Sequence, residues 1–351
     1  MSMENSHNIL IIRFSSIGDV LLATPLIRIL REKFPDASID FIVRREYAEL
    51  LQHNPYISHL IVFDSSEGFE GLRKLKNELK HASYDIVLDI HNSIRSRYLR
   101  KCLRVPVRTI HKRILQRFLL IHFKWNFYNG IVPVAERYLE AASFLEIEND
   151  GNGLDIFIPQ EINARVEARL REDLKNRNFV IGICPTARHK TKEWLPDRFI
   201  ALALRLHKDT NAAFLVFGGI EDRDYCSAIV DRINAECNDT AAINYAGRFS
   251  LLETASAMER CAIVVTNDSG LMHVAAAMKR KIVAIFGSTV EEFGFFPYGT
   301  RAIVVEQKEV RCRPCSHIGK EACPKKHFRC MNEISVDEVY NACKTLLSET
   351  Y

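Results

Sequence analysis

The sequence predicts an α/β protein of two domains, each with a mostly parallel sheet and helices on both faces. With 351 residues, 47% of them hydrophobic, the chain can bury a sizeable core. Short apolar runs alternate with helical patterns through both halves, which is typical of parallel sheets. A polar segment with glycine, residues 148–153, separates the halves. We therefore expect an N-terminal domain at 1–165 and a C-terminal domain at 166–351, whose last helix can pack back on the first domain.

Apolar runs predict the strands of both halves. In the first half they cover residues 9–14, 39–43, 59–63 and 85–90, and in the second half residues 179–183, 213–219, 243–247, 262–268 and 282–287. Amphipathic spacing is clearest over residues 21–34, where Leu22, Leu26 and Leu30 share one face, and Pro35 ends the helix. A charged helix over residues 162–177 begins the second half.

Positive charge is concentrated in one stretch. No Asp or Glu lies between Asp89 and Glu136, whereas this stretch has ten Lys and Arg, so the net charge of +4 leaves about −6 for the rest of the chain. Aromatic residues such as Phe118 and Trp125 are interspersed. This mixture is expected where a protein touches an anionic surface or a phosphorylated ligand, although a solvated basic helix face is the alternative.

The N-terminal sequence carries no targeting signal that we recognise. The first eight residues are polar, and the apolar run at 9–12 is too short for a signal peptide or a membrane span. We therefore expect a cytoplasmic protein, in which the ten cysteines remain free or bind metal. Four of them, Cys312, Cys315, Cys323 and Cys330, have the spacing C-x2-C-x7-C-x6-C, which allows structural zinc. The second pair is not a CxxC, so we favour free or occasionally oxidised thiols and no metal.

A carboxylate follows the first predicted strand, in the sequence SSIGD at residues 15–19. Gly18 permits a tight turn from strand to helix, and Asp19 arrives at the helix start. A carboxylate there commonly caps the helix or complements its dipole. It can also accept the proton of a hydroxyl that attacks a sugar carbon, as a general base.

Two loops of the second half are suited to phosphate. In PTARHKTKEW, residues 185–194, Thr186 and Lys192 offer a hydroxyl and a cation that can grip a diphosphate, unless the loop is only an exposed basic turn. In NDSGLMHVAAAM, residues 267–278, Ser269 and Gly270 open a helix whose amides and dipole favour an anion. His273 lies in the first turn of this helix, where a purely structural role is equally plausible.

The remaining motif is acidic. In FGGIEDRD, residues 217–224, Asp222 or Glu221 can accept hydrogen bonds from a ribose diol, or can simply cap the next helix. The chain has neither GxGxxG nor GxxxxGK[ST], so no motif supports a dehydrogenase or a P-loop ATPase.

Taken together, these segments resemble glycosyltransferase family 9, the heptosyltransferases of the lipopolysaccharide inner core. The likeness runs from IRFSSIGDVLLATPLIRIL through PTARHKTKEW and NDSGLMHVAAAM to CRPC and CPKKHFRCM, and it spans almost the whole chain. It implies the GT-B arrangement of two facing Rossmann-like domains. It also implies an inverting transfer of heptose from ADP-heptose to a phosphorylated, lipid A-linked acceptor.

The resemblance also implies roles for individual residues. The family's catalytic base matches Asp19. Its donor-phosphate residues match Thr186, Lys192, Ser269 and Gly270, and Asp268 and His273 coincide with the same motif. The ribose position falls on Asp222 or its neighbour Glu221, and the base lies near Gly247. Candidate acceptor contacts are Arg13, Ser15, Ser16, Asn92 and Arg95.

No cofactor is expected, because Lys192 and the helix start can stabilise the departing diphosphate. The basic stretch fits peripheral contact with the cytoplasmic face of the inner membrane, and we expect no nucleic acid partner. Three alternatives remain: a GT-B transferase for another nucleotide sugar, a nucleotide-sugar epimerase, and a catalytically idle relative. A nucleic-acid-binding protein is a different class, but it leaves the phosphate motifs unexplained.

Overall fold

The computed structural model describes residues 7–175, 177 and 179–349. Contacts divide the chain into two compact units. Met1–Lys112 and Pro133–Phe157 form the first unit, and Arg113–Val132 and Ile158–Tyr351 form the second. The sequence predicted a single passage between domains near residue 165. By contacts, the chain instead joins the second unit over Arg113–Val132, returns to the first, and leaves it again after Phe157.

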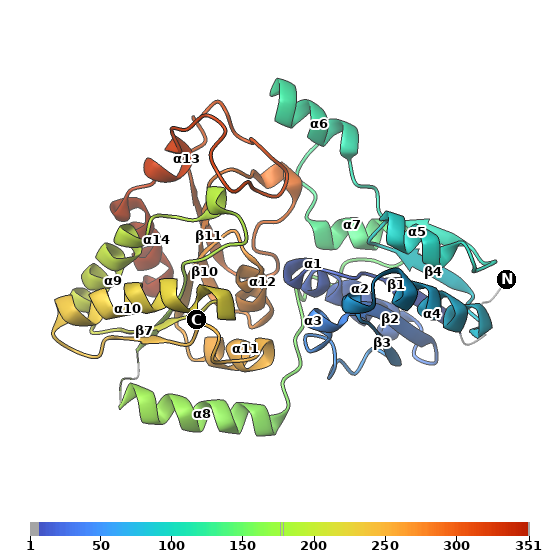
Figure 1. Ribbon diagram of the computed structural model, residues 1–351, viewed down its shortest axis with the longest axis horizontal. Helices are drawn as coiled ribbons and strands as arrows, with labels where there is room; N and C mark the ends of the chain where they lie inside the picture. Colours follow the sequence, from blue (N-terminus) through green and yellow to red (C-terminus); the bar gives the residue numbers. More distant parts are fainter. Residues whose placement is uncertain (1–6, 176, 178, 350–351) are drawn as a thin grey trace. The chain divides into compact units, whose positions relative to one another are not determined.

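The first unit is built on a five-stranded sheet in the order β3-β2-β1-β4-β5, and every strand pair is parallel (Figure 1). The strands are β1 (Asn8–Ile12), β2 (Ser38–Arg44), β3 (His59–Phe63), β4 (Ile86–Asp89) and β5 (Val107–Thr109). The helices are α1 (Ile17–Leu21), α2 (Thr24–Lys33), α3 (Arg45–Ala48), α4 (Gly68–His81), α5 (Ile94–Arg100) and α7 (Val134–Ala141). The four predicted strands are present. The edge strand β5 was missed because three residues among cations give no readable periodicity.

The helix predicted over residues 21–34 is α2, which begins three residues later, at Thr24, after the short separate helix α1. α1 ends at Leu21, and α2 begins at Thr24 with Pro25 in its first turn. Proline lacks the amide hydrogen that would continue the first helix, and its ring clashes with the carbonyl four residues earlier. Pro25 is therefore well placed as the start of a new helix. The prediction therefore located this helix but placed its start three residues too early, because it did not take Pro25 into account.

The second unit is built on a six-stranded sheet in the order β11-β10-β9-β6-β7-β8, again with every pair parallel. The strands are β6 (Val180–Cys184), β7 (Ala213–Val216), β8 (Ala242–Asn244), β9 (Ile263–Asn267), β10 (Lys281–Phe286) and β11 (Ala302–Glu306). The helices are α6 (Ile114–Phe123), α8 (Gln160–Leu174), α9 (Pro196–Thr210), α10 (Arg223–Cys237), α11 (Leu251–Glu259), α12 (Gly270–Ala277), α13 (Arg329–Asn332) and α14 (Val336–Ser348). The edge strand β11 was not predicted.

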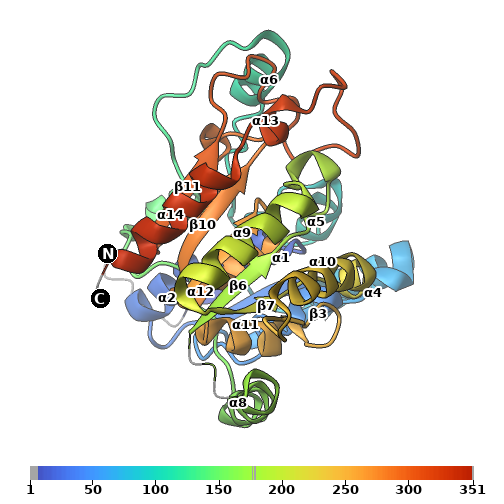
Figure 2. The same ribbon diagram turned by 90° about the vertical axis from the view of Figure 1, so that its left-hand side faces the viewer.

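The last helix finds its partners inside its own unit. α14 packs along α9, β10 and β11 (Figure 2). Its buried side chains join the core around Trp194, which is fully buried. α8 covers most of the predicted charged helix at 162–177, of which residue 176 lies outside the described residues. The α/β architecture with two parallel sheets confirms the predicted fold class. Across the described residues, no helix combines the length and apolar character that a membrane crossing needs.

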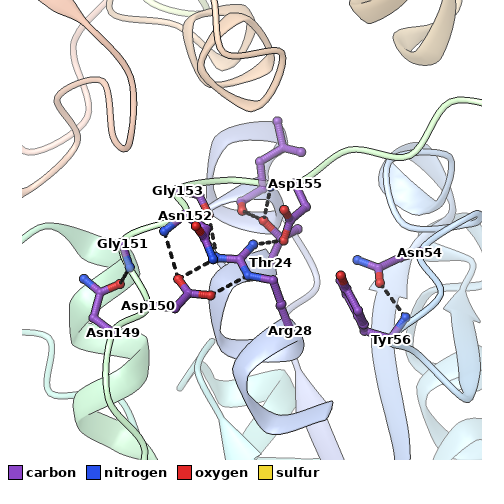
Figure 3. A network of polar contacts seen from close by, with 11 residues as sticks. Thr24, Arg28, Asn54, Tyr56, Asn149, Asp150, Gly151, Asn152, Gly153 and Asp155 are labelled. Atoms are coloured by element: carbon purple, nitrogen blue, oxygen red, sulfur yellow. Dashed lines mark hydrogen bonds and ion pairs between the residues drawn. The ribbon is translucent and has the colours of Figure 1, made fainter. Parts of the chain in front are cut away.

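A buried arginine of α2 binds residues 150–155, close to the end of the first unit. The Arg28 side chain is 5% exposed, and it forms ion pairs with Asp150 at 2.6 Å and with Asp155 (Figure 3). It also donates to the Gly153 carbonyl at 3.0 Å, while Thr24 Oγ1 accepts the Asp155 amide at 2.9 Å. The segment that leads out of the unit is therefore held by one guanidinium with several acceptors.

We expect Arg28→Met to lower the free energy of unfolding by about 3 kcal/mol, because it leaves two largely buried carboxylates without their cation. Arg73→Met removes an exposed pair with Glu70 and should cost less than about 1 kcal/mol. The hydrogen bond from Arg28 lowers the pKa of Asp150, so the stabilisation exists above the ordinary carboxyl pKa and disappears as the pH falls through the lowered value. Urea denaturation at neutral and acid pH measures both effects; equal losses in the two variants would contradict the assignment.

Candidate functional site

The first cluster of candidate residues lies at a switch point of the first sheet. The chain builds β1, β2 and β3 in one direction, then returns to place β4 on the other side of β1. Ligands of open parallel sheets bind outside the carboxyl ends of the strands at such a point. Arg13 directly follows β1, and His91 and Asn92 follow β4.

Asp19 is held by three side chains of this unit. Arg13 Nη2 lies 2.5 Å from Asp19 Oδ1, and Ser16 Oγ donates to Oδ2 at 3.0 Å. The Tyr138 hydroxyl lies 3.4 Å from Oδ1, and its ring contacts the Arg13 guanidinium at 5.7 Å. Ser16 is also the N-cap of α1, so Asp19 completes a capping box. The capping role and a chemical role can therefore coexist.

Burial favours the neutral form of Asp19, but the attraction of Arg13 and the hydrogen bonds from Ser16 outweigh it. Together they hold the pKa of Asp19 below its ordinary value. Arg13 is fixed in turn, because it donates to the carbonyls of Ser15 at 2.8 Å and Ile90 at 3.0 Å. Asp19 is consequently an ionised carboxylate in a fixed position at neutral pH.

His91 lies beside this pair as a neutral base. Burial, together with the nearby cations Arg13 and Lys112, lowers the pKa of His91 to about 3, although Asp19 acts to raise it. Its ring meets Phe14 edge-on with 5.2 Å between centroids. Within the part of the chain that the structure describes, its buried Nδ1 has no hydrogen-bond partner.

The other first-unit candidates are placed differently. Asn92 supports its own loop: its amide donates to Asp89 Oδ1 at 2.6 Å, and its side chain lies 3.4 Å from the Ile110 carbonyl. Arg95 is exposed near the start of α5 and contributes to the positive field at His91. Ser15 and Ser16 both lie in the loop between β1 and α1.

The second cluster lies at the switch point of the second sheet. The chain builds β6, β7 and β8, then returns to place β9 on the other side of β6. Thr186 and Lys192 follow β6, while Asp268 and Ser269 follow β9. The two phosphate motifs of the sequence therefore emerge from adjacent strands.

Lys192 and Asp268 form an ion pair at 2.7 Å, with side chains that are 14% and 6% exposed. Thr289 Oγ1, which follows β10, donates to Asp268 Oδ2 at 2.6 Å. Asn267 fixes the loops together, since its side chain accepts from the Trp194 amide and donates to the Pro185 carbonyl. Lys192 is thus a cation held in place from three strand ends.

The start of α12 lacks the usual cap. Ser269 is the N-cap residue, but its hydroxyl makes no capping hydrogen bond, and no partner for this buried oxygen exists among the described residues. Serine normally satisfies an amide of the first turn from this position. The amides at Gly270 and beyond therefore remain available to a ligand. His273 is buried in the same first turn.

Asp222 bridges two loops rather than standing free. Its Oδ2 accepts from Thr186 Oγ1 at 2.9 Å and from the Gly219 amide at 2.8 Å. Glu221 beside it is exposed. Gly247 follows β8 with φ +65°, and a Cβ atom there would lie 2.7 Å from Ile220 Cα, so only glycine fits.

The cysteine motif forms no disulfide among the described residues. Cys312, Cys315 and Cys323 are partly buried, and Cys330 is buried. Nowhere in residues 7–175, 177 and 179–349 do three or more His, Cys, Asp or Glu side chains converge as a metal site would require. Burial raises the pKa of Cys330 to about 11.

Sequence reasoning missed Tyr138, His91 and Thr289. Thr289 follows a predicted strand, and ligands of open parallel sheets bind outside the carboxyl ends of strands, so this position could have been singled out. His91 follows another predicted strand and was open to the same argument. Tyr138 lies on α7, far from Asp19 in sequence, and no local pattern indicates their contact.

The fold and the two switch-point clusters define a two-domain α/β enzyme of the glycosyltransferase type. A family model described as glycosyltransferase family 9 (heptosyltransferase) matches residues 72–326. The chain belongs to this family. Its membership confirms the resemblance inferred from the motifs.

Individual relatives agree with this assignment. The chain is 28% identical to lipopolysaccharide heptosyltransferase 2 of Escherichia coli over 294 residues, which cover 81% of this chain and 84% of the relative. The crystal structure of a family 9 glycosyltransferase from Veillonella parvula matches with a TM-score of 0.79 and 26% identity, covering 98% of both chains. The E. coli ADP-heptose lps heptosyltransferase II structure matches in fold, with a TM-score of 0.69, 22% identity, and coverage of 97% and 98%.

We expect His91 to remain neutral through the working pH range, because burial and neighbouring cations disfavour its charged form. In ¹⁵N NMR the ring signals, assigned with His91→Gln, should keep their neutral shifts from about pH 8 down to about pH 5. A titration midpoint near the ordinary histidine value would show that this environment is wrong.

Proposed function

We propose that this protein transfers heptose from ADP-heptose to a phosphorylated, lipid A-linked acceptor of the lipopolysaccharide inner core, with inversion at the anomeric carbon. The family membership supports heptosyl transfer. The names of the E. coli relatives support lipopolysaccharide as acceptor and ADP-heptose as donor. The single observation that carries the proposal is the fixed Lys192 beside an uncapped helix start.

In this proposal the second unit binds the donor. Lys192, Thr186 and the first-turn amides at Ser269 and Gly270 hold the diphosphate, with His273 close by. Support comes from the helix dipole, which favours an anion at this end of α12, and from the vacant hydroxyl of Ser269. These groups already supply positive charge to the departing diphosphate, so we propose that no cofactor is required.

Asp268 then acts on the donor only through Lys192. A carboxylate repels a diphosphate, but the carboxylate of Asp268 orients the ammonium group of Lys192. It is fixed in turn by the hydrogen bond that Thr289 donates to it. We assign the ribose hydroxyls to Asp222, with Glu221 beside it, and the base to the space near Gly247. Asp222 would exchange its bond from Thr186 for bonds from the ribose.

The first unit supplies the proton acceptor. We propose that Asp19 takes the proton of the acceptor hydroxyl while that oxygen bonds to the anomeric carbon and the bond to the diphosphate oxygen breaks. A carboxylate with a lowered pKa is a modest base, but Asp19 is already ionised at neutral pH and held in a fixed position by Arg13, so it needs no activation. Arg13 and Tyr138 are positioning residues for it.

The acceptor's phosphates are assigned to cations of the basic stretch. Arg95 is exposed at the start of α5, and Asn92, Ser15 and Ser16 line the same switch point. Arg13 was also a candidate acceptor contact, and its ion pair with Asp19 leaves it a mainly orienting role in this proposal. We further propose that the protein works in the cytoplasm, in peripheral contact with the inner membrane.

We expect Asp19→Asn to lower kcat by about 10²- to 10⁴-fold, because the amide cannot accept the proton, while the affinity for ADP stays unchanged. Asp36→Asn, at an exposed turn after α2, is the matched control and should retain full activity. Mass spectrometry of the acceptor after incubation with ADP-heptose measures transfer. Wild-type turnover by Asp19→Asn would exclude the general-base role, and transfer from UDP-sugars alone would exclude the donor.

We expect Lys192→Met to weaken ADP binding at least about tenfold, because it removes a charge-assisted bond and leaves Asp268 facing the diphosphate. Lys190→Met is the control from the same loop, since Lys190 is 63% exposed and pairs with Glu193. Adding Asp268→Asn to Lys192→Met should restore part of the affinity by removing the repulsion. Calorimetric titration with ADP measures all three; equal affinities for both lysine variants would contradict the proposed phosphate site.

A further inference from the structure

An exposed apolar surface is concentrated in one short segment of the second unit. Of the thirteen large hydrophobic side chains that are exposed among the described residues, seven lie within residues 113–132. They are Ile114, Leu115, Phe118, Phe123, Trp125, Phe127 and Ile131. We call residues 113–132, which include α6, the aromatic segment. A contiguous apolar surface of this kind marks an interaction site in a soluble protein.

The helix of this segment breaks the usual rule for helices of globular domains. α6 consists of ILQRFLLIHF, yet Leu120 is its only buried residue. A helix that is apolar nearly all round is normally enclosed by protein or lipid. No described element encloses this one, so its apolar surface is open to a partner.

The segment is attached to its unit through polar groups. Lys124 Nζ donates to the carbonyls of Ile121 at 2.8 Å, Cys312 at 3.0 Å and Pro314 at 2.6 Å. Asn126 Nδ2 donates to Glu292 Oε1 at 2.7 Å. The polar side chains thus serve the attachment while the apolar ones stay in water, which is the reverse of an ordinary surface helix.

The aromatic side chains form a preassembled cluster. Phe118 and Phe123 lie 6.1 Å apart between ring centroids, and Phe123 stacks on Trp125 at 5.3 Å. His122 contacts Phe118 at 4.5 Å. Rings that already pack together lose little conformational freedom when they enter another phase, which favours binding.

The charge of the segment selects the kind of partner. It contains Arg113, Arg117 and Lys124 and no Asp or Glu, so its net charge is positive, although the Lys124 ammonium group is itself bound to the Cys312 and Pro314 carbonyls. A second copy of this chain would bring the same cations to a symmetric contact, where they would repel. An anionic lipid surface instead complements the cations and accepts Phe and Trp at the boundary between headgroups and acyl chains.

We propose that the aromatic segment is a membrane-docking surface, which inserts the side chains of Phe118, Phe123 and Trp125 into the interface of an anionic bilayer. The inference rests on the proposed function for its biological sense, because a lipid A-linked acceptor lies at such an interface. The exposed apolar side chains and the positive charge of the aromatic segment do not depend on that function. Lipid binding can therefore be tested without any sugar transfer.

The two tryptophans of the chain give a direct test, because Trp125 is 57% exposed and Trp194 is fully buried. The full-length protein is mixed with vesicles of phosphatidylcholine, with or without phosphatidylglycerol, that carry brominated acyl chains. We expect the anionic vesicles to quench Trp125, and the quenching to fall when the ionic strength rises from about 0.1 to about 0.5 M. In Trp125→Phe the remaining fluorescence of Trp194 should stay unquenched.

A matched pair of variants distinguishes binding through the aromatic segment from nonspecific binding of exposed hydrophobic side chains to lipid. Phe118→Ser/Phe123→Ser should weaken partition into anionic vesicles by about tenfold or more. Phe69→Ser/Phe144→Ser removes two exposed phenylalanines of the first unit and should leave partition within about twofold. Since all four side chains are exposed, thermal melts should be similar in both variants.

Three results would overturn the proposal: no quenching by anionic vesicles, equal partition of the two double variants, or self-association that Phe118→Ser/Phe123→Ser abolishes. The last would make the segment a contact between copies. A different result would contradict the proposed function but not the docking surface: the wild-type protein would bind vesicles but transfer no heptose to a water-soluble acceptor. Phe118→Ser/Phe123→Ser should still act on that acceptor at the wild-type rate.

Discussion

Both clusters of this protein depend on one geometric constraint: the carboxyl ends of parallel strands lie at the same edge of a sheet. In each sheet the chain reverses its direction of growth once, between β1 and β4 and between β6 and β9. At these points successive loops diverge and leave a space that helices do not fill. Asp19, in the first turn of α1, and Lys192 lie on the connections that leave β1 and β6 at their carboxyl ends. The fold therefore determines where chemistry is possible before any side chain is chosen.

Each switch point contains a largely buried ion pair between a cation and a carboxylate, and the roles of the two charges are reversed between them. At the first, the carboxylate of Asp19 is the proposed reacting group, and Arg13 holds it ionised and fixed. At the second, the ammonium group of Lys192 is proposed to bind the diphosphate, and Asp268 holds it in place. Each partner also reduces the cost of keeping a charge in a mostly buried place, since an isolated ion there would shift toward its neutral form. Preorganisation of this kind lets the charges act without rearrangement.

The sequence predicted what depends on local pattern and missed what depends on distant contacts. Apolar periodicity located nine strands. The motifs after two of them indicated Thr186, Lys192 and Ser269, and the family resemblance added Asp268. Periodicity failed for the edge strand β5, and it placed the start of α2 three residues before Thr24. It could not show that Tyr138 contacts Asp19, because these residues are more than a hundred positions apart and the sequence of α7 contains no pattern that indicates the contact. Nor could it show that Asp222 accepts a hydrogen bond from Thr186, 36 residues earlier, in addition to the capping bond from the Gly219 amide.

The basic stretch shows why composition and structure must be considered together. From composition, residues 90–135 were a single region of positive charge and aromatic rings. The structure divides it between α5, whose buried side chains include Leu99, and α6, which buries only Leu120. A fold that buries an apolar stripe on its other helices gains nothing from leaving Phe118, Phe123 and Trp125 in water, and it risks aggregation. Their exposure is consistent with insertion into a lipid bilayer, and the cations in the same segment favour a bilayer with an anionic surface.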